Sequence, residues 1–255
     1  MELFDTHAHL DDSRLYDDID GVLERAVAAG VMRIATIGCD WQSSLFAVRL
    51  AERYSGRIYA AIGVHPHEAK DYSEETAEKL YQLALLPQVV AWGEIGLDFH
   101  YDHSPRDVQR RVFRAQIALA KEVGKPMIIH DREAHEEVLA ILHEEKAQTG
   151  IFHCFSGSWE MAKICLNLGF YISFAGPVTF SNSRKLQDIA ANVPLDRILV
   201  ETDCPYLSPE PWRGRPNQPA HVAYVAEKLA AIRGLSGDEM AAITTANACR
   251  IYDIL

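Results

Sequence analysis

The sequence predicts an α/β fold, an eight-stranded parallel β/α barrel of the TIM-barrel type, and three observations support this prediction. Eight short apolar segments rich in β-branched residues recur along the chain, and longer segments with helical periodicity separate them. The apolar segments are nearly continuous in hydrophobic character, as expected for strands buried on both faces. No low-complexity stretch or Ser/Gly-rich linker interrupts the 255 residues, so we expect a single domain over residues 1–255.

Each predicted strand is a short apolar run, and each is followed by a segment of helical period. In chain order the predicted strands are Leu3–His7, Arg33–Ile37, Ile58–Val64, Val89–Glu94, Pro126–His130, Gly150–His153, Phe170–Phe174 and Ile198–Glu201. A doubly wound open sheet is the alternative architecture, but its usual signatures are missing. No G-x-G-x-x-G follows the first strand, and no G-x-x-x-x-G-K-[ST] occurs anywhere.

Glycines mark the ends of three of the predicted helices, and the first of these, Gly30, suits a left-handed C-cap. These helices are Asp18–Ala29, Asp107–Glu122 and Ser158–Leu168. The last of them follows the tripeptide SGS, and Ser158 is a suitable N-cap because its hydroxyl can accept a hydrogen bond from the first helical turn.

The composition argues against several classes of protein. No basic, apolar leader begins the chain and no apolar stretch is long enough to span a bilayer, so we expect a cytoplasmic protein without a membrane partner. The five cysteines are scattered and form no C-x-x-C pair, which argues against a disulfide framework or a structural zinc site. No long amphipathic seam stands out, so we expect a monomer.

The net charge of −11 restricts the choice of partners. A protein that binds duplex DNA without regard to sequence normally presents a basic surface, because phosphate neutralisation supplies most of its affinity. This chain either does not act on phosphodiesters or uses bound cations to supply positive charge locally.

Polar side chains that can perform chemistry collect at the ends of the predicted strands. In a β/α barrel these ends lie on one face of the molecule, where the active site is built. We therefore expect one pocket to receive the residues His7, His9, His65, Glu94, Asp98, His130, His153, Glu201 and Asp203.

The stretch FDTHAHL places His7 and His9 on the same side of the first strand, because side chains alternate along a strand. Two imidazoles on one face can bind one metal ion. Together with His130, His153, Glu94 and Asp203 they exceed the needs of a single tetrahedral ion, so we expect two divalent ions bridged by the Glu94 carboxylate. Mixed imidazole and carboxylate donors suit Zn, Mn, Fe, Co or Ni, whereas Mg prefers oxygen, and the metal stays open among these six.

Other residues carry weaker signals. His65 is a ligand, a substrate contact or a packed histidine, and Asp98 and Glu201 could orient the metal-binding histidines. Phosphate could bind where a loop enters a helix or where arginines follow the eighth strand. These candidates are Ser156 and Gly157 in the loop, and Arg213 and Arg215 after the strand. We expect surface or structural roles for His67, His100, His103, His135, His143 and His221.

Several motifs together resemble the TatD-type metal-dependent deoxyribonucleases over essentially the whole chain. They are FDTHAHLD, GVHPH, GEIGLDFHYD, KPMIIHDREA, HCFSGS, GFYISFAGPVTF, LVETDCPYLSPEPWRGRPNQP and TTANACRIY. The resemblance implies a barrel hydrolase of the amidohydrolase-like group with a divalent-metal centre. It implies that the metal ligands are His7, His9, Glu94, His130, His153 and Asp203, with Glu94 as the bridge. It also implies catalytic roles for Asp203, Glu94 and His65, with His65 touching the substrate phosphate.

The resulting hypothesis is a 3′-5′ exonuclease that hydrolyses single-stranded or frayed DNA ends through a water activated by two metal ions. An amide or ester hydrolase on the same barrel is the alternative, although the fourth strand reads WGEIG and lacks the lysine that bridges the ions in many such enzymes. A metal-binding scaffold without turnover is a third possibility. One departure from the resemblance is Gln218, where many members carry Glu.

Overall fold

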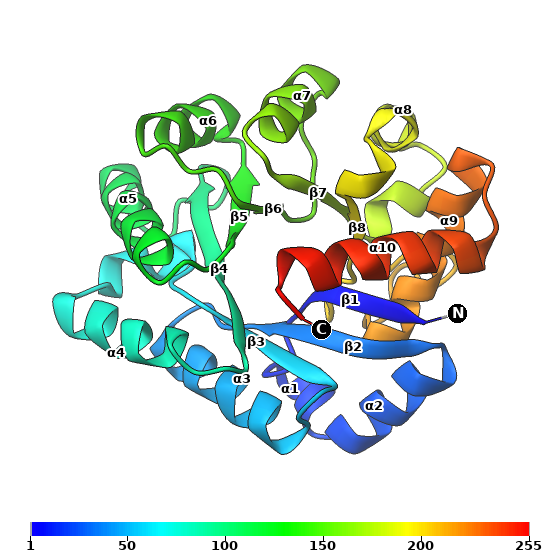
Figure 1. Cartoon of the computed structure of the whole chain (residues 1–255), viewed down its shortest axis with the longest axis horizontal. Coiled ribbons are helices and arrows are strands. Elements are labelled where there is room, and N and C mark those ends of the chain that lie inside the picture. Colours follow the sequence, from blue (N-terminus) through cyan, green and yellow to red (C-terminus); the bar gives the residue numbers. More distant parts are fainter. Residues whose placement is uncertain (1, 255) are drawn as a thin grey trace.

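The eight predicted strands pair in chain order as one parallel sheet, in a computed structural model that describes residues 2–254 (Figure 1). The strands are β1 (Leu3–Ala8), β2 (Val31–Ile37), β3 (Ile58–Ile62), β4 (Val89–Asp98), β5 (Met127–Arg132), β6 (Gly150–Phe152), β7 (Tyr171–Phe174) and β8 (Ile198–Val200). A parallel bridge between Ala8 and Cys204 brings the chain after β8 beside β1, so the sheet is nearly closed. The predicted barrel is thus confirmed.

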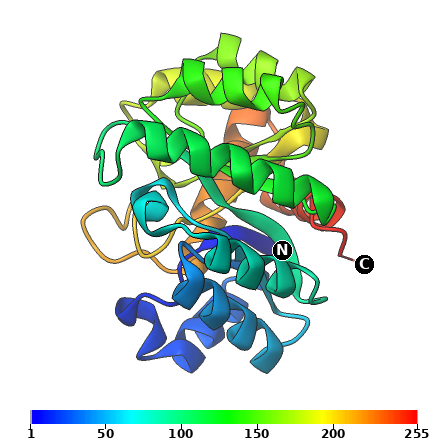
Figure 2. The same ribbon diagram turned by 90° about the vertical axis from the view of Figure 1, so that its left-hand side faces the viewer.

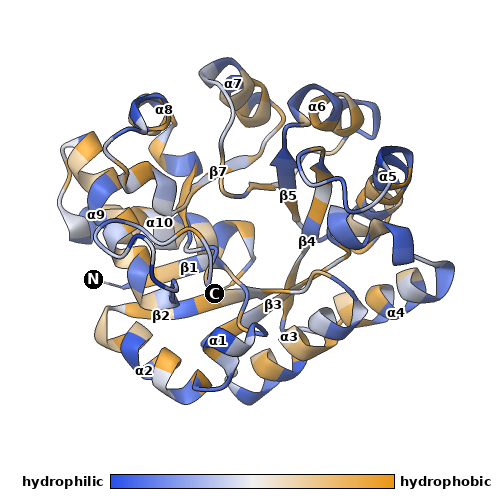
Figure 3. Ribbon diagram, turned by 180° about the vertical axis from the view of Figure 1, so that it is seen from behind, coloured by the Kyte–Doolittle hydropathy of each residue, from blue (hydrophilic) through white to orange (hydrophobic). Residues whose placement is uncertain are grey.

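Helices surround the strands and turn their hydrophilic residues outward (Figure 3). They are α1 (Ser13–Tyr16), α2 (Ile19–Ala28), α3 (Trp41–Arg53), α4 (Glu74–Ala84), α5 (Arg106–Glu122), α6 (His135–Glu144), α7 (Trp159–Asn167), α8 (Arg184–Asn192), α9 (Val222–Arg233) and α10 (Gly237–Ile251). Short 3-10 turns are η1 (Pro66–Asp71), η2 (Gly176–Thr179), η3 (Leu195–Arg197) and η4 (Pro219–His221). The predicted caps are present: Ser158 accepts a hydrogen bond from the Met161 amide, and Gly30 has a φ of 84°. No helix within residues 2–254 combines the length and apolar character needed to cross a membrane.

Strand β4 differs most from the sequence prediction, since it continues past Glu94 to Asp98. Its pairing with β5 is irregular between Trp92 and Ile95, where the backbone bends around Glu94. Gly96 has a φ of 150°, and a Cβ atom at this position would lie 1.9 Å from the carbonyl oxygen of His130. The absent side chain lets β4 pass close to β5, which sets Glu94 and His130 side by side.

The floor of the barrel is closed by α10, which crosses the amino-terminal ends of the strands near the N-terminus (Figure 1). Its residues Ala248 and Ile251, with Tyr252 directly after it, pack among the apolar side chains of the strands. The Tyr252 hydroxyl donates a hydrogen bond to the Thr6 carbonyl at 2.8 Å. Burial of one apolar side chain of this size stabilises a fold by roughly 1.5–3 kcal/mol, so α10 contributes substantially to the inner core.

Hydrogen bonds fasten the chain after β8 to β1. Asp5 accepts bonds from the Thr202 amide at 2.8 Å and the Thr202 hydroxyl at 2.6 Å. The Asp203 amide donates to the His7 carbonyl at 2.9 Å, and the His9 amide donates to the Cys204 carbonyl at 2.8 Å. This seam places the Asp203 side chain beside the two histidines of FDTHAHL.

Candidate metal centre

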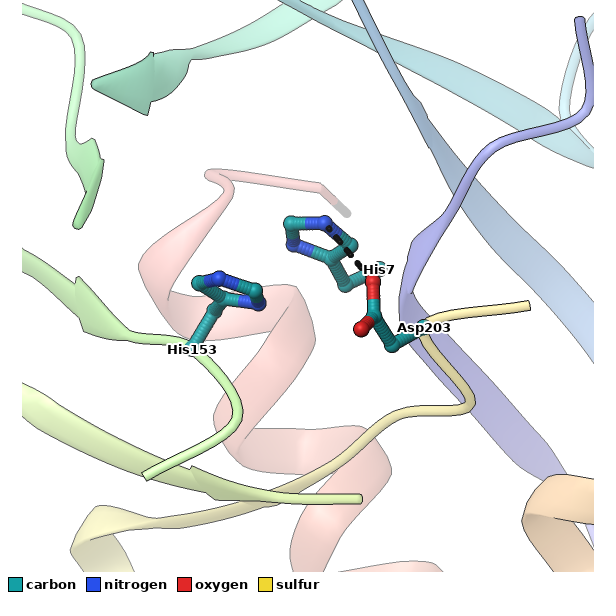
Figure 4. Close-up of side chains that lie close together, drawn as sticks. All are labelled: His7, His153 and Asp203. Carbon is teal, nitrogen blue, oxygen red and sulfur yellow. Dashed lines mark ion pairs between the residues drawn. The ribbon is translucent and has the colours of Figure 1, made fainter. Parts of the chain in front are cut away.

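The carboxyl ends of the strands bring the six predicted metal ligands together at one end of the barrel. The loops that follow β3, β4 and β8 lie on one side of the molecule, opposite the C-terminus (Figure 2). Figure 4 shows three of the six, His7, His153 and Asp203, which project toward one another from β1 and from the chain just after β6 and β8. The other three are His9, Glu94 and His130.

Glu94 lies at the centre, and each of its carboxylate oxygens faces a different set of imidazoles. Its Oε1 lies 2.6 Å from His130 Nδ1 and 2.7 Å from His153 Nε2. The same oxygen lies 3.4 Å from His65 Nε2. The pKa of Glu94 stays well below its ordinary value, because the attraction of His153 and His65 and the hydrogen bonds of His130 and His153 together outweigh the opposing effect of burial.

The second oxygen of Glu94 faces the histidines of β1. Its Oε2 lies 3.3 Å from His7 Nε2 and 3.8 Å from His9 Nε2. Asp203 Oδ1 completes this side at 3.6 Å from His7 Nε2 and 3.3 Å from His9 Nε2. The two oxygens of Glu94 thus face two different sets of ligand side chains, which is the arrangement that a carboxylate needs to bridge two cations.

The donor chemistry of this cluster fits divalent metal ions. Three groups of residues each offer three donor atoms that lie within 4.8 Å of one another. The groups are His7, His153 and Asp203; His7, His9 and Glu94; and His65, Glu94 and His130. Nε2 of His7 and Nε2 of His9 face each other at 3.3 Å, so a proton or a cation must lie between them. Neutral imidazole is the form that binds metals. Burial lowers the pKa of His7 and favours that form.

The charge balance of the cluster also suits a cation. Burial disfavours a charge on His153, but the nearby Glu94 and Glu201 carboxylates prevail and raise its pKa well above the ordinary value. Without a cation, protons on the histidines would therefore balance the carboxylates. Metal binding would displace those protons, as is usual for sites of this composition.

Two further carboxylates contact the outer nitrogens of the predicted ligands. Asp98 Oδ2 lies 3.1 Å from His130 Nε2, and Glu201 Oε1 lies 3.3 Å from His153 Nδ1. Glu201 also accepts a hydrogen bond from the Cys154 amide at 2.8 Å. Carboxylates in such positions fix the ring orientation and tautomer of a metal-binding histidine. Both residues lie where the sequence predicted orienting groups.

The hydrogen bonds of His65 favour a substrate contact over a metal ligand. The His67 amide donates to His65 Nδ1 at 3.1 Å, so the neutral ring carries its proton on Nε2. Burial lowers the pKa of His65 to about 4, which keeps the ring neutral near pH 7. Its Nε2–H points toward Glu94 and can donate to an anionic substrate.

The metal cluster opens into a pocket of about 660 Å³. Its walls include residues that sequence reasoning missed, namely His67, Tyr101, His103, Arg132 and Tyr206. His67 and His103 differ from the expected surface or structural role, and His67 Nε2 lies 2.8 Å from Asp98 Oδ2. Four of these residues stand beyond the strand ends, and Arg132 is the last residue of β5, so no residue spacing marks them. Their position at or shortly after a strand end was the only available signal.

The four predicted phosphate contacts do not line this pocket. Ser156 is exposed, and Gly157 packs closely against Met161 at the start of α7. The Arg213 guanidinium carbon lies 4.4 Å from the centre of the Phe180 ring. The corresponding carbon of Arg215 lies 5.5 Å from the centre of the Trp212 ring. The loop after β8 thus directs both arginines to aromatic neighbours.

Gln218 connects this loop to α2 and to a buried histidine. Its Oε1 accepts a hydrogen bond from Arg25 Nε at 2.8 Å, and its Nε2 donates to His221 Nε2 at 3.2 Å. His221 Nδ1 donates to Asn217 Oδ1 at 3.0 Å. A glutamate could accept from Arg25 but could not donate to His221, so glutamine suits a neutral histidine here.

His221 is expected to make the fold sensitive to acid. Burial lowers its pKa from 6.5 to about 4, so the unfolded chain takes up a proton at higher pH than the folded chain does. The contribution of the neutral His221 to the free energy of unfolding is complete above pH 6.5 and is lost as the pH falls toward 4. Urea unfolding of the protein and of His221→Gln at pH 7.5, 5.5 and 4.5 measures it. The stability gap between them should narrow on acidification, and a constant gap would contradict the assignment.

Comparisons with known proteins agree with this chemistry. The family model for TatD related DNase matches residues 4–253. The chain is 49% identical over 254 residues to the uncharacterized metal-dependent hydrolase YabD of Bacillus subtilis, with 99% of each protein covered. It is 38% identical over 259 residues to the 3′-5′ ssDNA/RNA exonuclease TatD of Klebsiella pneumoniae, covering 99% of this chain and 98% of that protein. The crystal structure of YJJV, a TatD homologue of Escherichia coli, matches with a TM-score of 0.94 and 32% identity over 99% of this chain and 98% of that one.

Proposed function

The chain belongs to the family of TatD-related DNases and is a metal-dependent hydrolase, and from this premise we propose that it is a deoxyribonuclease acting on 3′ ends. Its substrate in this proposal is single-stranded or frayed DNA, which it shortens by hydrolysing phosphodiester bonds. The observation that carries the proposal is the Glu94 carboxylate, whose two oxygens face separate sets of imidazoles at 2.6–3.8 Å. The name of the Klebsiella relative supports the polarity and the single-stranded substrate.

Six side chains would hold two divalent ions, with Glu94 between them. His7, His9 and Asp203 would serve one ion, and His130 and His153 the other. When bound, such ions supply Lewis acidity that lowers the pKa of water and neutralises phosphate charge.

The remaining chemistry falls to the chain's own residues. Asp203, whose pKa is held below its ordinary value by His9 and His7 despite burial, is ionised and would accept the proton of the attacking water. His65 would donate its Nε2–H to a non-bridging phosphate oxygen, where negative charge increases during the reaction. Asp98 and Glu201 would keep His130 and His153 in the orientation that faces Glu94.

Short strand ends suit the charge of the molecule. Because the net charge is −11, the protein body repels an extended polyanion, and affinity must come from the metal centre and a few contacts around it. A chain terminus brings fewer phosphates to the surface than a continuous duplex does. The cytoplasm and a monomeric state remain our expectations for the protein's setting.

A digest of matched DNA and RNA substrates tests the proposal. Protein reconstituted with each candidate metal is incubated with linear single-stranded, duplex and circular single-stranded substrates carrying 5′ or 3′ labels. We expect a 5′-labelled single strand to shorten stepwise and the circular strand to persist. Cleavage of the circle at the rate of the linear strand would contradict an end-directed enzyme. Turnover of a cyclic amide but not of nucleic acid would favour the amide hydrolase. Full metal occupancy without turnover of any substrate would favour the metal-binding scaffold.

A further inference from the structure

Two half-exposed tyrosines stand on opposite sides of the pocket. Tyr101 follows β4 and Tyr206 follows β8, and these strands lie on opposite sides of a barrel in which eight strands pair in chain order. Both side chains line the pocket, with 49% of Tyr101 and 50% of Tyr206 exposed. Exposed aromatic rings beside a catalytic pocket are the surfaces on which unpaired bases stack.

An arginine lies over each of these rings, but the two arginines differ in charge balance. The Arg14 guanidinium carbon lies 4.9 Å from the centre of Tyr206, and Arg14 forms paired hydrogen bonds of 2.8 and 2.7 Å with the Asp12 carboxylate. The Arg132 guanidinium carbon lies 4.6 Å from the centre of Tyr101. Arg132 forms no ion pair with any carboxylate of residues 2–254. The Tyr101 side therefore keeps an uncompensated positive charge.

The charges on the rest of the wall strengthen this asymmetry. The carboxylates of Asp11, Asp12 and Glu68 also line the pocket, on the sides of β1 and β3. Arg132 is the one Lys or Arg among the described residues that line it. Among the Lys and Arg side chains of this wall, a phosphate beside the metal centre can therefore pair only with Arg132.

The Tyr101 loop is fixed to the metal centre through one carboxylate. Asp98 Oδ1 accepts hydrogen bonds from the His100 amide at 3.0 Å and the Tyr101 amide at 2.9 Å. The other oxygen of Asp98 lies 3.1 Å from His130 Nε2. The His103 ring stacks on Tyr101 at 5.5 Å with an angle of 8° between the planes. Tyr101 therefore has a defined position relative to the reacting phosphate.

We propose that Tyr101 and Arg132 form the nucleotide subsite of this pocket. Arg132 binds the phosphate next to the scissile one, and the base that this phosphate carries stacks on the part of the Tyr101 ring that Arg132 and His103 leave exposed. Tyr206, across the pocket, offers a stacking surface without net positive charge and holds a second base. The proposal rests on the nuclease function proposed above and adds the residues that select a single strand over a duplex, since a paired base cannot stack on either ring.

Binding measurements separate the charge from the ring. Anisotropy of a fluorescent eight-nucleotide phosphorothioate oligothymidylate, which resists hydrolysis by the metal-loaded protein, should show Arg132→Gln binding about tenfold more weakly than the unaltered protein, with Arg132→Lys in between. The slope of the logarithm of the binding constant against the logarithm of salt concentration should become shallower by about 0.7 for Arg132→Gln, as expected for one lost phosphate contact. Tyr101→Ala should weaken binding by a similar factor without changing this slope, and Tyr101→Phe should bind normally.

Kinetics with two substrates identify the step that each variant affects. For the oligonucleotide, Arg132→Gln and Tyr101→Ala should raise KM about tenfold and change kcat less than threefold. For methyl p-nitrophenyl phosphate, which has no second phosphate and no base, both variants should match the unaltered protein. Arg53→Gln is the matched control, because Arg53 lies over Tyr54 at 4.9 Å on the surface, away from the pocket.

The outcomes distinguish the subsite from the function. If the unaltered protein cleaves oligonucleotides and the Arg132 and Tyr101 variants bind and cleave equally well, the subsite is wrong and the nuclease stands. Equal losses on the small diester would also overturn the subsite, because they indicate damage to the metal centre. If the unaltered protein cleaves no nucleic acid with any metal, the nuclease function is wrong and the subsite with it.

Discussion

Replacement of Glu94 by alanine should abolish hydrolysis, lowering kcat on the order of a thousandfold, which corresponds to about 4 kcal/mol of transition-state stabilisation. The carboxylate contacts His130 and His153 through one oxygen and His7 through the other. Its loss removes the shared donor and leaves buried imidazoles without their negative partner. Both effects weaken metal binding at the same position.

Metal content and activity together check this prediction. Glu94→Ala should retain less metal after dialysis than the unaltered protein, as measured by mass spectrometry of the bound elements. Glu52→Ala on the exposed side of α3 is the matched control and should retain both metal and activity. Substantial activity in Glu94→Ala would show that a bridge through this residue is not required.

Substitution of Gly96 by alanine should destabilise the fold by roughly 2–5 kcal/mol. The new Cβ atom would lie 1.9 Å from the His130 carbonyl oxygen, and the φ of 150° is unfavourable for any residue with a side chain. Relief of the clash requires β4 and β5 to separate. Because Glu94 and His130 lie on these strands, metal binding should weaken together with stability.

A second glycine isolates the clash from the backbone conformation. Gly124 has a φ of 68° and no atom within 4 Å of an added Cβ, so Gly124→Ala should cost only about 1 kcal/mol. Urea unfolding of both variants measures the difference. Equal destabilisation by the two substitutions would mean that the close approach of β4 to β5 is not important for stability.

The arrangement of the strands could be predicted because each is a short apolar run that both faces of the sheet bury. The residues at which the strands begin and end were less predictable where the backbone is irregular. Strand β4 extends four residues beyond the predicted end at Glu94, because Gly93 and Gly96 let a bent strand keep its pairing with β5. Apolar periodicity contains no information about such a bend.

The six predicted ligands come together because parallel strands bring their carboxyl ends to one face, whatever their distance in sequence. The pocket wall could not be predicted in the same way. Tyr101 reaches the pocket through a loop that Asp98 fixes by hydrogen bonds to two backbone amides, and Arg132 reaches it from the last position of β5. Conversely, Arg213 and Arg215 belong to the loop that follows β8, yet this loop directs them to Phe180 and Trp212.

The packing of α10 beneath the strands makes the pocket a dead end. Its side chains occupy the inner core together with those of the strands, and the Tyr252 hydroxyl bonds to the backbone of β1. A polymer cannot thread through such a barrel, so a nucleic-acid strand that reaches the metal centre must enter and leave by the same mouth. On the proposed function, a free terminus enters readily, whereas an internal segment must fold back on itself. After each cleavage the shortened strand must advance toward the floor or dissociate.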